Sequence, residues 1–143
     1  MKKLFVLAAA AALISLGGAA QTLAASLVAH IDISAQTMTV KKSGRVVGRW
    51  KVSTARKGYY TPRGTYRPTR MHKMWHSRKY DMSPMPHSIF FRGGYAIHGT
   101  GAIKRLGRPA SHGCVRLHPN NARKLYQLTR QVGARNVRIV ITN

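Results

Sequence analysis

The stretch Ser111-His112-Gly113-Cys114-Val115-Arg116-Leu117 contains the only cysteine of this 143-residue chain. Gly113 permits a tight turn, so that the backbone amides of Gly113 and Cys114 can converge on negative charge developing on an oxygen atom. Imidazole or cationic neighbours increase the reactive thiolate fraction of a cysteine. The stretch therefore predicts a turn that presents Cys114 as a nucleophile.

Two histidines are candidates for a general base beside Cys114. His112 lies only two positions away, and its side chain is expected to point elsewhere, whereas His98 belongs to a separate strand and can approach the thiol. A hydroxyl or a backbone carbonyl is predicted to orient His98, because Asp81 is the only acid in the loop region. A lone cysteine also allows a buried inert thiol or a disulfide to another chain.

Outward from this stretch, the sequence predicts a mainly β domain with one main helix. Apolar alternation and turn signals predict an opening β-meander, a later hairpin through Gly93-Gly94 and a buried closing strand. The predicted strands are 27–33, 37–40, 46–52, 89–91, 95–98 and 137–141. Prolines and glycines predict loops over 55–88, apart from a short strand near 65–69. Apolar spacings predict a helix after the cysteine, with Asn120 as N-cap and Gly133 as its stop.

The composition is strongly basic, with 25 Lys and Arg residues against two acids and a formal charge of +23. This charge favours an anionic partner such as nucleic acid, a membrane surface or a cell-wall polymer. Only Asp32 and Asp81 supply carboxylates, which argues against a glycosidase pair, an aspartic dyad or a calcium site. His72 and His76 suggest zinc only weakly, so we expect neither a metal nor another cofactor.

The N-terminus has the pattern of a secretory signal peptide. Met1, Lys2 and Lys3 precede an apolar run over 4–16 and then small residues. This run is too short for a stable transmembrane anchor, which needs about 20 apolar residues. We predict a signal peptide over 1–25, with Ala20 as an alternative cleavage position, and a single domain over 26–143 in the periplasm or cell envelope. Export makes a nucleic-acid partner less favoured.

His98-Gly99-Thr100 and the 111–117 stretch together resemble the signature of the L,D-transpeptidase family, the YkuD-like catalytic domain. Upstream, Thr61-Pro62-Arg63-Gly64-Thr65-Tyr66 resembles a further segment of that family. The resemblance implies a β-sandwich or open barrel of the YkuD-like type.

In such enzymes a cysteine attacks a peptidoglycan stem tetrapeptide, releases D-alanine and forms a thioester that an amine resolves. The resemblance implies that Cys114 is the nucleophile and His98 its base. Ser111, His112 and Gly113 complete the implied catalytic site, and Arg116 is implied to bind a substrate carboxylate. Gly99 and Thr100 belong to the same implied substrate site. Arg116 has a simpler interpretation as a structural hydrogen-bond donor.

The sequence leaves several functions open. An L,D-transpeptidase acting in cell-wall biogenesis and cell shape would pass the acyl group to another stem peptide or to an envelope protein. With water as acceptor the same site would be an L,D-carboxypeptidase. The alternatives from other classes are a non-catalytic cationic envelope-binding protein and, more distantly, a zinc hydrolase.

Overall fold

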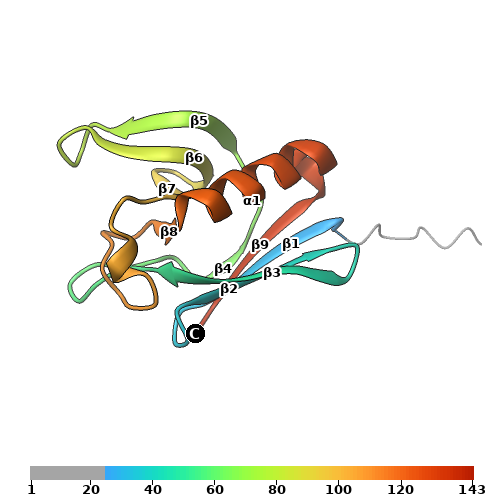
Figure 1. The fold of residues 1–143 in the computed structure, drawn as a ribbon, viewed down its shortest axis with the longest axis horizontal. Coiled ribbons are helices and arrows are strands. Elements are labelled where there is room, and N and C mark those ends of the chain that lie inside the picture. The colour runs from blue at the N-terminus through green and yellow to red at the C-terminus, as the bar shows by residue number, and fades with distance from the viewer. Residues whose placement is uncertain (1–24) are drawn as a thin grey trace, which may run out of the picture.

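The computed structural model describes residues 25–143, so the predicted signal peptide, apart from Ala25, lies outside the described residues. The described part of the chain begins with the predicted meander (Figure 1). Its three antiparallel strands are β1 (Leu27–Asp32), β2 (Thr37–Lys42) and β3 (Arg45–Ser53). Their alternating apolar residues face a common core, which confirms the prediction made from period-two patterning.

The closing strand β9 (Val137–Thr142) is also confirmed, and it pairs in parallel with β1. The short strand β4 (Gly64–Tyr66) lies on the other side of β9 in antiparallel orientation. The first and last strands thus lie side by side in the sheet, and only a long crossover can join parallel strands in this way.

The prediction of loops over 55–88 was wrong for its second half. The structure has β5 (Arg70–Ser77) and β6 (Ser83–Arg92), which form a long antiparallel hairpin. Pro84 and Pro86 reduced the apparent strand propensity of this segment. Each proline lies opposite a histidine or methionine of the outermost strand, β5, and proline is tolerated near the edge of a sheet.

After the hairpin, β7 (Tyr95–Gly99) pairs antiparallel with β6 and parallel with β8 (Val115–Leu117). β8 also pairs with the end of β3, which joins the two halves of the structure. The described residues form one curled nine-stranded sheet in the order β4-β9-β1-β2-β3-β8-β7-β6-β5. Short 3-10 helices occupy Ile103–Arg105 and Ala134–Asn136.

The predicted helix is α1 (Pro119–Val132), which packs against β6 and β7 inside the curl of the sheet (Figure 1). Gly133 is the C-cap, with φ +84°, as predicted. The prediction of Asn120 as N-cap was wrong, because the ring of His118 accepts the Asn120 N–H and Pro119 takes the first helical position. Of the described helices, none is long and apolar enough to span a membrane.

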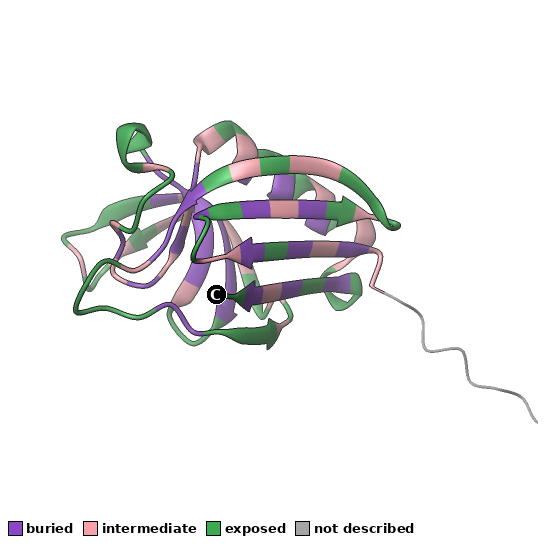
Figure 2. Ribbon diagram, turned by 90° about the horizontal axis from the view of Figure 1, so that it is seen from below, coloured by how far each residue is buried: buried purple, intermediate pink, exposed green. Residues whose placement is uncertain are grey.

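The main core lies between α1 and the inner face of the sheet. Figure 2 shows how buried and exposed residues alternate along the strands that enclose it. The core includes Leu27, Ile31 and Leu125, all of them almost inaccessible to solvent. A smaller cluster of Met85, Phe90 and Ala96 lies apart from it, with Trp75 and Cys114 packed against it. The fold is therefore the mainly β architecture with one helix that the sequence predicted.

Candidate active site

The parallel register of β7 and β8 places the chemically important residues on one face of the sheet. His98 lies opposite Arg116, and Ile97 lies opposite Val115. Because side chains alternate along a strand, Ile97 and Val115 enter the main core while His98 and Arg116 face the opposite side. Cys114 precedes β8 by one residue and lies on the same side as Arg116. The pleat of two neighbouring strands thus brings Cys114 and His98 into one space.

That space is a cavity of about 760 Å³, and Cys114, His98 and Arg116 all line it. The β5–β6 hairpin supplies much of the remaining wall. Its apolar part includes Trp75, Met85 and Phe90. The lining residues within 25–143 include cationic side chains and no carboxylate. The site is therefore a positively charged pocket with a partly apolar wall, suited to an anionic substrate.

Ser111 and Thr61 fix the loop that carries the cysteine. The fully buried Ser111 hydroxyl donates to the Cys114 carbonyl at 2.7 Å and accepts the Gly113 N–H at 3.0 Å. The Thr61 hydroxyl donates to the Gly113 carbonyl at 2.8 Å and accepts the Ala55 N–H. These buried hydrogen bonds hold the loop from both sides and leave the Cys114 side chain directed into the cavity.

Gly113 is the residue on which this loop depends. Its φ of +135° is a conformation that residues with a side chain rarely adopt. A Cβ added there would lie 2.6 Å from the ring of Tyr95 and 2.8 Å from the carbonyl oxygen of Tyr60. Both backbone conformation and space therefore require glycine immediately before the cysteine.

His98 is buried, with 6% of its surface exposed, and its Nδ1 lies 2.6 Å from the Gly99 carbonyl oxygen. A carbonyl oxygen only accepts, so this contact places the proton on Nδ1 and leaves the lone pair on Nε2. Burial lowers the pKa of His98 to about 4, with a smaller opposing effect of the Gly99 hydrogen bond. The imidazole is consequently neutral at pH 7. Of the two orienting groups that the sequence suggested, the structure contains the backbone carbonyl.

The Cys114 thiol is half-buried, and burial raises its pKa. A hydrogen bond from the Ala96 amide and the positive charge of Arg116 act in the opposite direction but are smaller. We expected cationic neighbours to increase the thiolate fraction, and here the cost of desolvating the thiolate outweighs them. The resting cavity therefore contains a neutral thiol and a neutral imidazole, rather than an ion pair.

A family model describing the L,D-transpeptidase catalytic domain, YkuD, matches residues 26–141. The chain belongs to this family. A search of curated proteins finds no match.

Solved structures support the fold of this L,D-transpeptidase domain. An L,D-transpeptidase from Mycobacterium smegmatis is 24% identical, with a TM-score of 0.72 over 82% of this chain and 59% of that one. One from Xylanimonas cellulosilytica is 28% identical, with a TM-score of 0.70 over 85% and 62%. L,D-transpeptidase 3 from Mycobacterium tuberculosis, in complex with a faropenem-derived adduct, is 20% identical, with a TM-score of 0.72 over 82% and 60%. The chain thus spans less than two thirds of the length of each.

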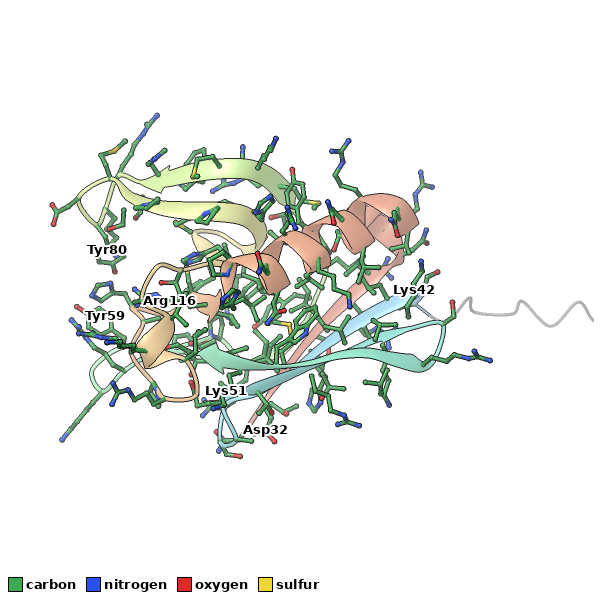
Figure 3. All side chains as sticks on the ribbon, in the orientation of Figure 1. Asp32, Lys42, Lys51, Tyr59, Tyr80 and Arg116 are labelled. Atoms are coloured by element: carbon green, nitrogen blue, oxygen red, sulfur yellow. The ribbon has the colours of Figure 1, made fainter. Side chains whose placement is uncertain are left out.

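Among the remaining motif residues of the L,D-transpeptidase domain, His112 packs between aromatic rings at the edge of the cavity. His112 lines the cavity but stacks on Tyr80 at a ring-centroid distance of 4.1 Å, and it meets the edge of Tyr59 at 4.7 Å. Figure 3 labels both tyrosines near Arg116 at the same end of the molecule. Burial, and then the charges of nearby cations, lower the pKa of His112. Its ring therefore connects the cysteine loop to the β5–β6 turn.

Thr100 lines the cavity, whereas Gly99 does not. A Cβ on Gly99 would lie 3.1 Å from Pro86 and 3.2 Å from the Cα atom of Pro119. Gly99 thus permits close packing behind the site and contributes its carbonyl to His98. Ser111 and Gly113 likewise lie behind the lining, where they shape the loop.

Arg116 is half-buried, and its Nη1 lies 3.4 Å from the Ala110 carbonyl oxygen. Burial lowers its pKa, although the guanidinium remains charged at neutral pH. The contact to Ala110 is of the kind that a structural hydrogen-bond donor would make, which is one of the two roles expected for this side chain. A guanidinium has five N–H donors, so others remain available to the cavity.

The β5–β6 wall of the cavity was not predicted from the sequence, because its prolines and glycines favoured loops over 55–88. Arg70, Trp75 and Tyr80 come from β5 and the turn after it. The sequence signal that could have predicted the β5–β6 hairpin is the pair of β-compatible segments before and after 78–82. His72, one of the zinc candidates, packs against Trp75 and Phe90. No group of three potential metal ligands occurs within residues 25–143.

Proposed function

We propose that this domain is an exported peptidoglycan L,D-transpeptidase that uses Cys114 as nucleophile and His98 as general base. The observation that carries the proposal is the position of both side chains on one face of β7 and β8, in the wall of a single cavity. Membership of the L,D-transpeptidase family supplies the reaction class. The proposed acyl donor is a stem tetrapeptide.

In the first half of the reaction, the unprotonated Nε2 of His98 takes the thiol proton as the Cys114 sulfur attacks the donor carbonyl. The C–S bond forms, and negative charge develops on the carbonyl oxygen. When this intermediate collapses, the C–N bond to D-alanine breaks and His98 returns the proton to the leaving amine. The products are a thioester and free D-alanine.

In the second half, an acceptor amine attacks the thioester carbonyl. His98 now takes a proton from the attacking nitrogen, the new C–N bond forms, and the C–S bond breaks with the proton returned to sulfur. An amine from another stem peptide would give a cross-link, and an amine from an envelope protein would anchor that protein. Attack by water would make the same site an L,D-carboxypeptidase.

The Cys114 amide is the principal oxyanion donor in this mechanism. The Gly113 N–H already donates to Ser111 Oγ, so Gly113 could join only by releasing that bond. Each well-aligned donor of this kind contributes about 3 kcal/mol to transition-state stabilisation. Gly113 and Ser111 thus act mainly by fixing the direction of the Cys114 amide and thiol.

The cations of the cavity are proposed to bind the carboxylates of the stem peptide. Arg116 is central among them, since its charge lies beside Cys114 and it retains free N–H donors. Thr100 adds a hydroxyl at the cavity wall, and its Oγ1 accepts the Ala102 N–H at 3.1 Å. His112 is a positioning residue in this proposal, because its ring packs between two tyrosines.

The cellular setting is part of the same proposal. A signal peptide over 1–25 would direct the catalytic domain over 26–143 to the periplasm or cell envelope, where its substrate occurs. No stable transmembrane anchor is invoked, and peptidoglycan stem peptides, with envelope proteins as further acceptors, are the expected partners. The reaction as written uses no cofactor.

Substitution of Cys114 by alanine tests the nucleophile. L,D-transpeptidase 3 from Mycobacterium tuberculosis carries a faropenem-derived adduct, and mass spectrometry should detect a covalent penem adduct on the wild-type protein here. The Cys114→Ala variant should form no adduct and should release no D-alanine from a stem tetrapeptide. An adduct or full D-alanine release in a folded Cys114→Ala variant would show that another residue is the nucleophile. Analysis of the peptide products then distinguishes amine from water as acceptor.

A further inference from the structure

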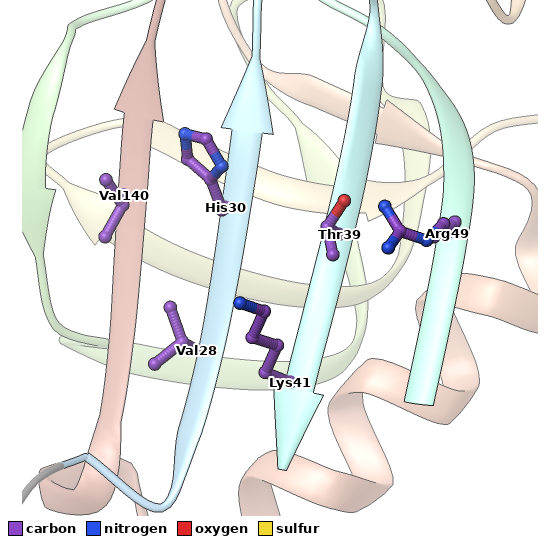
Figure 4. A pocket seen from close by; sticks show the side chains of 6 residues that line it. All are labelled: Val28, His30, Thr39, Lys41, Arg49 and Val140. Carbon is purple, nitrogen blue, oxygen red and sulfur yellow. The ribbon is translucent and has the colours of Figure 1, made fainter. Parts of the chain in front are cut away.

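A second hollow lies far from the cysteine, on the face of β9, β1, β2 and β3 that turns away from the core. It is a shallow groove of about 520 Å³ (Figure 4). The residues that line it are Val28, His30, Thr39, Lys41, Arg49 and Val140. None of them belongs to the active-site cavity, so the proposed reaction leaves the groove unexplained.

Strand register explains why these residues share one face. His30 lies opposite Val140 on one side and opposite Thr39 on the other, and Thr39 lies opposite Arg49. This row crosses four strands, so it spans about 15 Å at the usual strand spacing. Lys41 lies two residues from Thr39 and therefore on the same face, opposite Val28. The groove thus lies on one face of the sheet, where a β-bulge shifts the register of β2 and β3 between Val40 and Lys41.

The rim of the groove is cationic. In Figure 4 Lys41 extends from β2 toward β1, and the guanidinium of Arg49 turns toward Thr39. Arg138 lies opposite Val28 on the outer row and adds a further exposed charge. Asp32 occupies the far end of β1, where its carboxylate accepts hydrogen bonds from the Ser34 hydroxyl and the Ala35 amide. The groove lining itself contains no acid.

The floor of the groove combines apolar and hydrogen-bonding groups. Val28 and Val140 are half-buried and present methyl groups, while Thr39 presents a hydroxyl between them and Arg49. The His30 Nε2 lies 2.8 Å from the Thr142 hydroxyl, which fixes its ring at the edge of the groove. A ligand that matches this floor needs apolar faces, hydroxyl groups and negative charges at intervals.

We propose that this groove is a docking site for a linear anionic polysaccharide. The C–H faces of sugar rings would pack on Val28 and Val140, and carboxylates would pair with Lys41 and Arg49. The groove lining contains no Phe, Tyr or Trp on which nucleobases could stack, and no large apolar side chain that could insert into a bilayer. Charge complementarity and the mixed floor favour a carboxylated glycan over both alternatives.

The groove involves neither Cys114 nor His98, so docking is independent of the proposed chemistry. A polymer strand on the outer face would leave the cavity free to accept a peptide. Failure of the adduct experiment would therefore not affect this proposal, and loss of docking would leave acylation of a small soluble substrate unchanged.

Fluorescence anisotropy of the full chain with a labelled polygalacturonate oligosaccharide tests the proposal. The double variant Lys41→Gln/Arg49→Gln should bind about tenfold or more weakly, equivalent to about 1.4 kcal/mol. The matched control Arg123→Gln/Arg130→Gln removes the same charge from the exposed face of α1 and should bind like the wild type. Binding should also weaken with added salt.

Two results would overturn the proposal. An equal loss of affinity in the α1 control would show that total charge, and not the groove, binds the glycan. Tighter binding to phosphatidylglycerol vesicles or to a single-stranded oligonucleotide, with the same dependence on Lys41 and Arg49, would assign the groove to a different class of partner. Neutral dextran should not bind, and binding of dextran with wild-type affinity would equally exclude a charge-based site.

Discussion

The cavity around Cys114 and the groove on the outer sheet face are both lined by cations, yet their side chains are in different physical states. In the cavity, burial lowers the pKa of His98 to about 4 and raises that of Cys114. In the groove, Lys41, Arg49 and His30 are exposed to solvent. Exposed charges can attract a polyanion but are screened by water and salt. Burial is what gives the cavity neutral groups that can exchange a proton.

The largest expected difference between the two regions is the effect of a histidine substitution on the rate of Cys114 acylation. His98→Gln removes the proposed base and should slow acylation of Cys114 by about 10²- to 10⁴-fold. His30→Gln alters an exposed histidine of the groove and should leave the acylation rate unchanged. Mass spectrometry of the penem adduct over time measures both rates. Equal rates for His98→Gln and wild type would remove His98 from the mechanism.

Glycine substitutions compare the cysteine loop with the turn between β2 and β3. Gly113→Ala combines a φ of +135° with a Cβ placed 2.6 Å from Tyr95, and it should destabilise the fold by about 2–4 kcal/mol. Gly44→Ala has a φ of +79° but no atom within 4 Å of the new Cβ, so about 1 kcal/mol is expected. Urea unfolding measures the free energy of unfolding of both variants. Similar losses would mean that backbone strain alone, without crowding, determines the effect.

The pH dependence of acylation should reflect the burial of His98. Because its pKa is about 4 in the folded protein, the neutral base persists down to that pH. The acylation rate should then fall about tenfold per pH unit below it. A rate that already falls near pH 6.5, the value of an ordinary histidine, would mean that His98 is exposed in the reacting state.

The burial of His98 also predicts that the free energy of unfolding depends on pH. Between pH 6.5 and about 4 the unfolded chain binds a proton at His98 and the folded chain does not, so the free energy of unfolding should decrease as the pH falls through this window. His98→Gln should reduce this slope. Part of the slope should remain, because burial also lowers the pKa of His87 and His112.

The spacing of apolar residues along the sequence correctly predicted the meander, the closing strand and the helix. The meander, the closing strand and the helix were predicted because their apolar residues repeat at two or at three to four positions, and one buried face explains each pattern. β5 and the first half of β6 were missed because most of their residues are exposed or half-buried and two of them are prolines, whereas the buried end of β6 was predicted as the strand 89–91. These two strands depend on pairing with each other and with β7, which is a long-range interaction that no local window contains.

The sequence by itself determined the nucleophile candidate, the turn at Gly113 and the family resemblance, because these depend on residues adjacent in the chain. Only the tertiary structure decided that His98 and Cys114 share a face, since that follows from the parallel register of two strands separated in sequence. It also decided their protonation, because burial lowers the pKa of His98 and, at Cys114, raises the pKa more than the charge of Arg116 lowers it. The groove also depends on the tertiary structure, since four strands must pair before Lys41, Arg49 and Val140 can line one surface.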